Sequence, residues 1–301
     1  MRNVRSTVEG AFFAALTVIL YLASIYLPVL GILVSFLCPL PVMFLVIRWD
    51  ARLGILASCV ASILVFALAG LLQAVTCLLG FSLLGIAMGL TVKRGYDLPG
   101  IILINTLVSL LSKFALLGVA LLATGKNPLT ENLLLLEEAV RKTPWVSQNL
   151  PGTGDFVSLV KLVMPALLIV ASLFDTGCNF LLGRWIGKRI GLSFPDVPPF
   201  SEWRLPRSVF WAFVLGWVFI LFGGTSFLGR IGVNVQVVTQ LLFLLEGLSL
   251  VYYFLGKYIR SRAVRVAVLV FLLFQPLFSF LLSWLGVFDV FFDFRKLSSK
   301  R

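Results

Sequence analysis

The stretch LPGIILINTLVSLLSKFALLGVALLAT, residues 98–124, is apolar around most of its circumference and carries one charge, Lys113, near its middle, on the same face as Asn105 and Ser109. A helix of about 20 such residues is long enough to cross the hydrocarbon core of a bilayer. A helix on the surface of a soluble domain would instead show a polar face. This stretch therefore predicts a membrane-spanning helix, and the sequence on either side of it tests that prediction.

Apolar stretches of comparable length recur on both sides. The other predicted spans are residues 9–27, a second span ending near 47, then 53–72, 75–92, 159–184, 209–228 and 235–256. A last apolar stretch, 263–292, is interrupted by Gln275 and Pro276. The sequence therefore predicts an all-α protein, a polytopic integral membrane helical bundle of eight or nine transmembrane segments.

Composition supports lipid as the solvent of this chain. Hydrophobic residues make up 60% of its 301 residues and charged residues only 13%, whereas soluble domains carry about 25% charged residues. The net charge of +12 comes from short basic clusters between the apolar stretches. Such clusters are typical of membrane proteins, so we expect no nucleic-acid partner.

Lys and Arg fall in alternate loops, which predicts a bacterial inner-membrane protein with a cytoplasmic N-terminus. The basic loops carry Arg2 with Arg5, Arg48 with Arg52, Lys93 with Arg94, Arg184 with Lys188 and Arg189, and Lys257 with Arg260, Arg262 and Arg265. The C-terminal basic residues 295–301 conflict with this pattern if 263–292 crosses the membrane once. Either that stretch is a re-entrant pair of half-helices hinged at Pro276, or it crosses and violates the rule.

The stretch 193–207 is rich in proline and reads as a cytoplasmic linker. It separates a six-span unit, 1–192, from a C-terminal unit, 208–301, with two or three apolar segments. The long polar stretch after residue 124 includes a predicted amphipathic helix, 131–140, begun at Thr130.

The residue types that most often carry catalysis or bind metals are scarce. Histidine is absent, and the four cysteines lie within apolar runs without a C-x-x-C pair. We therefore expect neither an enzyme nor a metal site, and no cofactor.

Polar residues inside predicted spans point to a functional interior, because they are costly in lipid. The substrate-cavity candidates are Asn105, Ser109, Lys113, Asp175, Asn179, Gln236 and Glu246. Lys113 would face Asp175 or Glu246. The alternative is an intramembrane ion pair and hydrogen bonds that only hold helices together.

Three short segments resemble the YybS-like family of bacterial multi-pass membrane proteins. They are LGVFDVFFDFRK at residues 285–296, WRLP at 203–206 and EGLS at 246–249. The resemblance covers most of the chain and implies membership of a family without a settled activity.

The first six spans also resemble the S components of energy-coupling-factor vitamin transporters, which have six helices and a cytoplasmic N-terminus. An A-x-x-x-A patch on their first helix docks on an energising transmembrane subunit, which works with ATPases. Ala11 and Ala15 match that patch. The spans after residue 206 have no counterpart in S components.

Asp289, Asp293 and Arg295 end the last apolar stretch and are further candidates for docking a partner. The alternative is a local surface salt bridge, worth at most about 1 kcal/mol. Two functions follow from the whole sequence. One is a small-molecule binding or transport protein similar to an S component. The other is a membrane scaffold or assembly factor that acts through another membrane protein.

Overall fold

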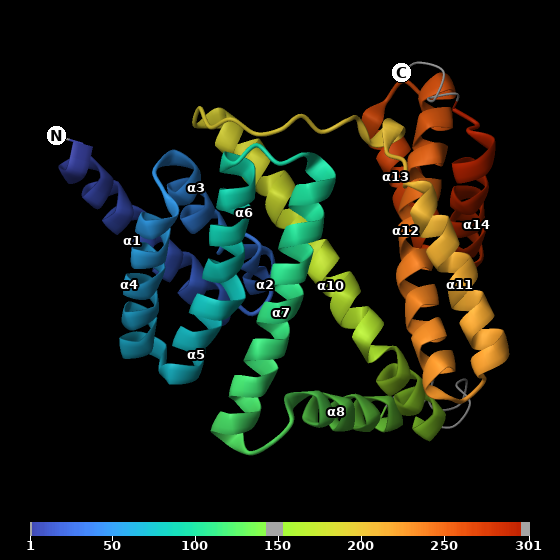
Figure 1. The fold of residues 1–301 in the computed structure, drawn as a ribbon, viewed down its shortest axis with the longest axis horizontal. Helices are drawn as coiled ribbons and strands as arrows, with labels where there is room; N and C mark the ends of the chain where they lie inside the picture. The colour runs from blue at the N-terminus through green and yellow to red at the C-terminus, as the bar shows by residue number, and fades with distance from the viewer. Residues whose placement is uncertain (1, 143–152, 296–301) are drawn as a thin grey trace. The chain divides into compact units, whose positions relative to one another are not determined.

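The computed structural model describes residues 2–142 and 153–295. Within these ranges every regular element is a helix, which confirms the predicted all-α membrane bundle (Figure 1). The chain forms two compact units. Unit 1 comprises Met1–Val157 with Ala171–Asp196, and unit 2 comprises Ser158–Val170 with Val197–Arg301. The long helix α10, Thr153–Arg189, contributes to both.

Unit 1 contains the five apolar segments that come before the long polar stretch. It also contains the second part of α10, from Ala171 onward. Its elements are α1 (Arg2–Tyr26), α2 (Leu30–Ser35), α3 (Leu40–Arg48), α4 (Ala51–Ala69), α5 (Leu71–Val75), the π-helix η1 (Thr76–Ser82), α6 (Leu83–Lys93), α7 (Leu98–Thr124) and α8 (Pro128–Lys142). Two predicted spans are therefore composite. The first is α2 with α3, and the second is α5 with η1 and α6.

Seven helical segments in the described ranges are long and apolar enough to cross a membrane, or eight if a bent pair near the C-terminus counts as one span. The helix α11, Arg207–Gly223, has 17 residues and is shorter. At 1.5 Å per residue it measures about 25 Å, near the thickness of the hydrocarbon core.

Helix α3 lies in the middle of unit 1, since every residue from Leu40 to Val46 is buried. Small residues allow its neighbour α6 to approach. A Cβ on Gly89 would lie 2.9 Å from the carbonyl oxygen of Met43, and one on Gly85 would collide with that of Pro39. Close backbone contact at glycine is a common way for membrane helices to associate.

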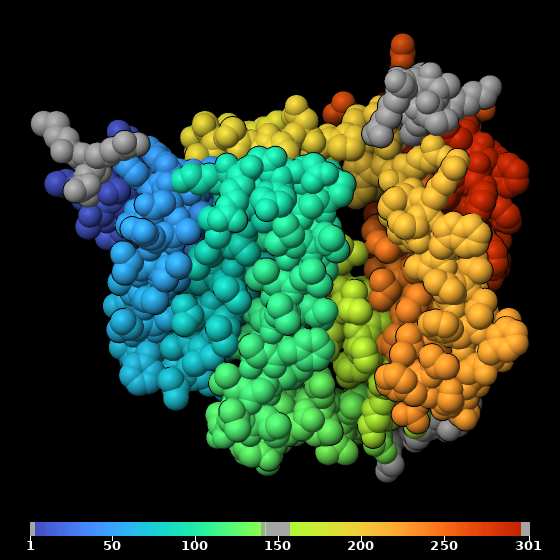
Figure 2. All heavy atoms as spheres, viewed as in Figure 1, coloured from blue at the N-terminus to red at the C-terminus, as the bar shows by residue number. Residues whose placement is uncertain are grey.

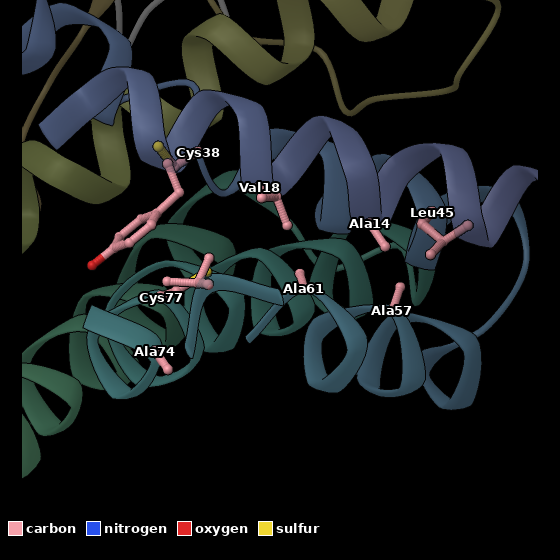
Figure 3. Packing of buried hydrophobic residues seen from close by; sticks show 10 residues of the cluster. Ala14, Val18, Cys38, Leu45, Ala57, Ala61, Ala74 and Cys77 are labelled. Carbon is pink, nitrogen blue, oxygen red and sulfur yellow. The ribbon is translucent and has the colours of Figure 1, made fainter. Parts of the chain in front are cut away.

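Helices α1 and α4 pack through alanines in the same manner. Ala14 and Val18 of α1 face Ala57 and Ala61 of α4 (Figure 3), and all four are buried. The Ala57/Ala61 repeat therefore lies at a helix contact.

The outer surface of unit 1 is apolar, as lipid requires. Helix α7 lies on the face shown in Figure 2, and Leu107, Leu111 and Phe114 on it are all more than half exposed. A soluble protein would bury these side chains, whereas a membrane protein turns them to the acyl chains.

The amphipathic helix after α7 begins earlier than predicted, at Pro128 instead of Glu131. Proline is well suited to the first turn of a helix. The side chain of Asn127 caps that turn by accepting a hydrogen bond from the backbone N–H of Leu129, at 3.0 Å.

Unit 2 contains the first part of α10, the linker with a 3₁₀ turn at Phe200–Glu202, α11, α12 (Phe227–Tyr258), α13 (Arg262–Phe274) and α14 (Pro276–Phe292). Pro165 interrupts the hydrogen-bond ladder of α10. The side chain of Asn234 in α12 forms hydrogen bonds with the α10 backbone on either side of Pro165. It donates to the carbonyl of Leu162 at 2.9 Å and accepts from the N–H of Ala166 at 2.9 Å.

The last apolar stretch is sharply bent. Helices α13 and α14 meet at Gln275 with an angle of 106°. Residues 243–247 of α12 contact residues 282–286 of α14. Farther toward the C-terminal ends of the two helices, Ser249 of α12 bonds to Arg295, which follows α14. Helices α12 and α14 therefore run in the same direction. Because Arg295 also bonds to Ser201 and Trp203, the end of α14 lies beside the linker. This geometry agrees with the re-entrant alternative; Lys296, Lys300 and Arg301 lie outside the described residues.

We expect the chain end and the linker to be accessible from the same side of the membrane. The test uses Glu202→Cys, an exposed linker position, in a background without the native cysteines, together with a reporter fused after Arg301. A membrane-impermeant maleimide should label the introduced thiol only from the side on which the reporter is detected. Detection on opposite sides would contradict the parallel arrangement.

We also expect Gly247→Ala to destabilise unit 2, because the added Cβ would collide with the carbonyl oxygen of Leu282. Overpacking of this kind costs about 1–3 kcal/mol. The matched control is Gly118→Ala in α7, where, apart from the neighbouring residues and backbone of α7 itself, nothing lies within 4 Å of the new Cβ. Thermal unfolding in detergent should show a lower melting temperature for Gly247→Ala alone. Equal melting temperatures for the two variants would count against this packing.

Candidate functional site

The predicted polar residues divide between the two units. Asn105, Ser109, Lys113, Asp175 and Asn179 lie in unit 1, whereas Gln236 and Glu246 lie in unit 2. They therefore belong to two clusters, which we describe in turn.

The unit 1 cluster is centred on an ion pair between Lys113 of α7 and Asp175 of α10. The Lys113 ammonium also donates to the Ser109 hydroxyl at 2.8 Å, and that hydroxyl lies 3.5 Å from Asp175 Oδ2. Of the two alternatives named for Lys113, the structure selects Asp175. The side chains of Lys113 and Asp175 are 25% and 34% exposed, so this charged pair is not sealed inside the bundle.

Two asparagines lie on the same helices as this pair. Asn179 follows Asp175 by about one helical turn, and Asn105 precedes Lys113 by about two turns. Helices α7 and α10 run in opposite directions (Figure 1), so Asn105 and Asn179 lie on the same side of the ion pair. Each amide nitrogen donates to the carbonyl four residues earlier, of Ile101 at 2.7 Å and of Asp175 at 2.8 Å. Both amide oxygens are buried and, among the described residues, have no donor.

The neighbouring span contributes a backbone acceptor. The π-helix η1 interrupts the regular ladder of the span formed by α5 and α6, and the Ser112 hydroxyl of α7 donates to the carbonyl of Leu79 within it. Single π-helical turns inside α-helices frequently accompany functional sites. Ser112 is adjacent in sequence to Lys113, so this irregular turn adjoins the ion pair.

Gln236 is separate from both charged clusters. Its side-chain oxygen lies 3.2 Å from the place that a Cβ on Gly216 of α11 would take, and it has no hydrogen-bond donor within the described part of the chain. The Thr239 hydroxyl donates to the carbonyls of its own helix. These contacts place Gln236 at the α11–α12 interface.

The unit 2 cluster is built around Arg295. Its side chain is fully buried, and those of Asp289 and Glu246 are each 1% exposed. Arg295 Nη2 lies 2.6 Å from Asp289 Oδ2 and 3.7 Å from Glu246 Oε1. Nη1 donates to the Ser249 hydroxyl at 2.7 Å and the carbonyl of Ser201 at 2.8 Å.

All five N–H groups of Arg295 have an acceptor, since Nε donates to Asp289 at 3.0 Å and Nη2 also donates to the carbonyl of Trp203 at 2.9 Å. Glu246 accepts from the backbone N–H of Leu205 at 3.2 Å. The cluster therefore joins α12, α14 and the linker.

Arg204 adds a second connection between the linker and α14. Its guanidinium lies 3.2 Å from Asp293 Oδ1 and donates to the carbonyl of Val290 at 3.3 Å. Asp293 ends α14 in the left-handed region, at φ 44°. That turn allows the N–H of Phe294 to donate to Asp289 at 3.1 Å and brings Arg295 back onto the helix end.

The predicted local salt bridge at the end of the last helix is present between Asp289 and Arg295, but its predicted place at the surface was wrong, because both side chains are buried in unit 2. Their contacts in the described residues are intramolecular, so neither faces outward as the docking prediction expects. Sequence reasoning did not select Arg204 or Ser249 as site residues. Arg204 lies in WRLP and Ser249 in EGLS, two of the segments that carry the family resemblance. That resemblance was the sequence signal that could have identified these two residues.

Ala11 and Ala15, the other docking candidates, lie on the exposed face of α1. Val8, Phe12 and Ile19 on this helix are also exposed, at 62–63%. No helix among the described residues of unit 1 covers this face, so docking there stays a prediction. Within residues 2–142 and 153–295 no group of three acidic, cysteine or histidine side chains is placed to hold a metal.

We expect Arg295→Gln to destabilise the protein strongly, because it leaves two buried carboxylates without their cation. Breaking a buried pair by removing one partner costs about 3–5 kcal/mol. The control is Arg5→Gln, which removes an exposed ion pair with Glu9 and should cost under about 1 kcal/mol. Denaturant unfolding in micelles compares the two. Similar losses would show that the Arg295 cluster is not structurally important.

The double variant Asp289→Asn with Arg295→Gln should cost less than the sum of the single changes, since it removes opposite charges together.

Comparisons with known proteins agree with the resemblance seen in the sequence. The chain is 26% identical to "Uncharacterized protein YybS" of Bacillus subtilis over 312 aligned positions, covering 98% of this chain and 99% of that protein. No solved structure matches. A family model described as "Predicted membrane protein (DUF2232)" matches residues 15–290. The chain therefore belongs to this family of membrane proteins.

Proposed function

We propose that this protein binds a small polar solute inside unit 1, as the binding component of a membrane transport system. The observation that carries the proposal is the Lys113–Asp175 pair, which lies in the apolar stretches of two helices and is still a quarter to a third exposed. A pair that only held helices together would be better buried, because ionised groups in contact with lipid are costly. An exposed pair fits a site that a solute enters.

The polar groups around the pair restrict the solute. The amide nitrogen of Asn105 donates to Ile101 and Thr91 and that of Asn179 donates to Asp175, whereas both amide oxygens have no donor among the described residues. The solute should therefore donate hydrogen bonds through N–H or O–H groups. Lys113 and Asp175 provide one charge of each sign, which suits a zwitterion or a neutral molecule with strong dipoles.

The exposed face of α1 supports the transport part of the proposal. Ala11 and Ala15 leave a shallow strip on this face, and a second helix approaches closely at small residues. The expected partner is an energising transmembrane subunit that works with ATPases. The proposed role is binding and transfer of the solute, without a catalytic step.

The first experiment measures thermal stability of the purified protein against vitamins, nucleobases, amino acids and metal ions. A solute at 100 times its Kd should stabilise the protein by about 2.7 kcal/mol. Lys113→Met should abolish the shift. The control Lys126→Met removes a lysine outside the predicted spans, paired with Glu131, and should leave the shift unchanged.

If no compound moves the melting curve of the folded protein, the solute-binding proposal fails. The scaffold hypothesis would then be tested by photo-crosslinking from Ala15, in cells, to a single membrane-protein partner.

A further inference from the structure

The structure contains an apolar groove in unit 2 that neither cluster uses. It is open to the surroundings of the protein, has a volume of about 380 Å³, and has walls that are almost entirely carbon. Phe254 and Tyr258 of α12 line it together with Leu285 of α14 and Phe294 after it. This volume is many times the roughly 30 Å³ share of a water molecule, and no polar group in the walls would hold water there. A hydrocarbon chain suits such a groove.

Basic side chains gather at the end of the groove where α12 ends. The Lys257 ammonium lies 4.9 Å from the ring centroid of Phe254, which is itself a wall of the groove. Arg260 lies in the short connection after α12, Arg262 begins α13, and Arg265 packs over Tyr252 at 4.7 Å.

No acidic residue occurs in the sequence between Glu246 and Asp289. Among the described residues none of the four cations forms an ion pair, and the Arg265 Nε–H lacks an acceptor. An open apolar groove beside unpaired cations suits an occupant with a hydrocarbon tail and an anionic head.

We infer that the groove binds one acyl chain of an anionic diacyl phospholipid, whose phosphate lies against Lys257 and Arg260. Both side chains are exposed, so they can reach a headgroup at the membrane surface while the acyl chain follows α12 inward. Electrostatic attraction of a basic segment to an anionic leaflet would hold any acidic lipid loosely. The groove makes the site specific by fixing the position of one chain. This inference is independent of the solute site in unit 1.

Native mass spectrometry of the full chain in detergent tests the site with two probes, phosphatidylglycerol and phosphatidylcholine with identical acyl chains. We expect tighter binding of phosphatidylglycerol. Lys257→Gln with Arg260→Gln should weaken it by about 30-fold and leave phosphatidylcholine binding unchanged. The control pair Arg52→Gln with Arg94→Gln removes two exposed charges from unit 1 and should change neither lipid.

A second variant tests the groove separately from the charges. Leu285→Trp at a 40% exposed position places a larger side chain in the groove and should weaken both lipids. Three results would overturn the inference. They are equal affinity of the parent protein for the two lipids, an equal loss in the Arg52/Arg94 control, and unchanged lipid binding by Leu285→Trp. The melting temperature of each variant, measured without lipid, verifies its fold.

Discussion

The structure of unit 2 depends on the burial of one guanidinium. Arg295 has no water in reach, so each of its five N–H groups must find an acceptor within the protein. Those acceptors come from the linker, α12 and α14, which are far apart in the chain. Satisfying Arg295 therefore fixes where the linker meets the helices and where α14 ends. It also explains why α14 turns left-handed at Asp293, because only that turn returns residue 295 to the helix end.

The same constraint is met differently in unit 1. Lys113 and Asp175 neutralise each other, but they remain partly exposed, and two buried amide oxygens near them lack donors among the described residues. In unit 2 every N–H of the buried Arg295 has an acceptor, whereas in unit 1 the ion pair is partly open and the oxygens of two asparagines on the same helices have no donor among the described residues. Buried polar groups normally find partners, and this difference is the reason for proposing a solute site in unit 1.

Sequence reasoning succeeded where one segment decided the outcome. Hydropathy placed the spans, and the spacing of Asn105, Ser109 and Lys113 placed them on one helical face, because the helical period is fixed by the backbone. Small-residue spacing is less decisive: in the structure Ala57 and Ala61 lie at a helix contact, but the same spacing at Ala11 and Ala15 lies on an open surface. Small-residue repeats thus show where a helix can be approached, without showing whether this chain supplies the partner.

The sequence by itself determined that the chain is helical and lies in a membrane, because lipid requires long apolar segments whose backbone groups are bonded internally. It also indicated family membership through three short segments. Only the tertiary structure decided that these segments meet around Arg295, that Lys113 pairs with Asp175 and not with Glu246, and that α14 runs parallel to α12. Each of these facts joins residues separated by tens of positions or more, and side-chain pairing across such distances depends on packing that no local period records.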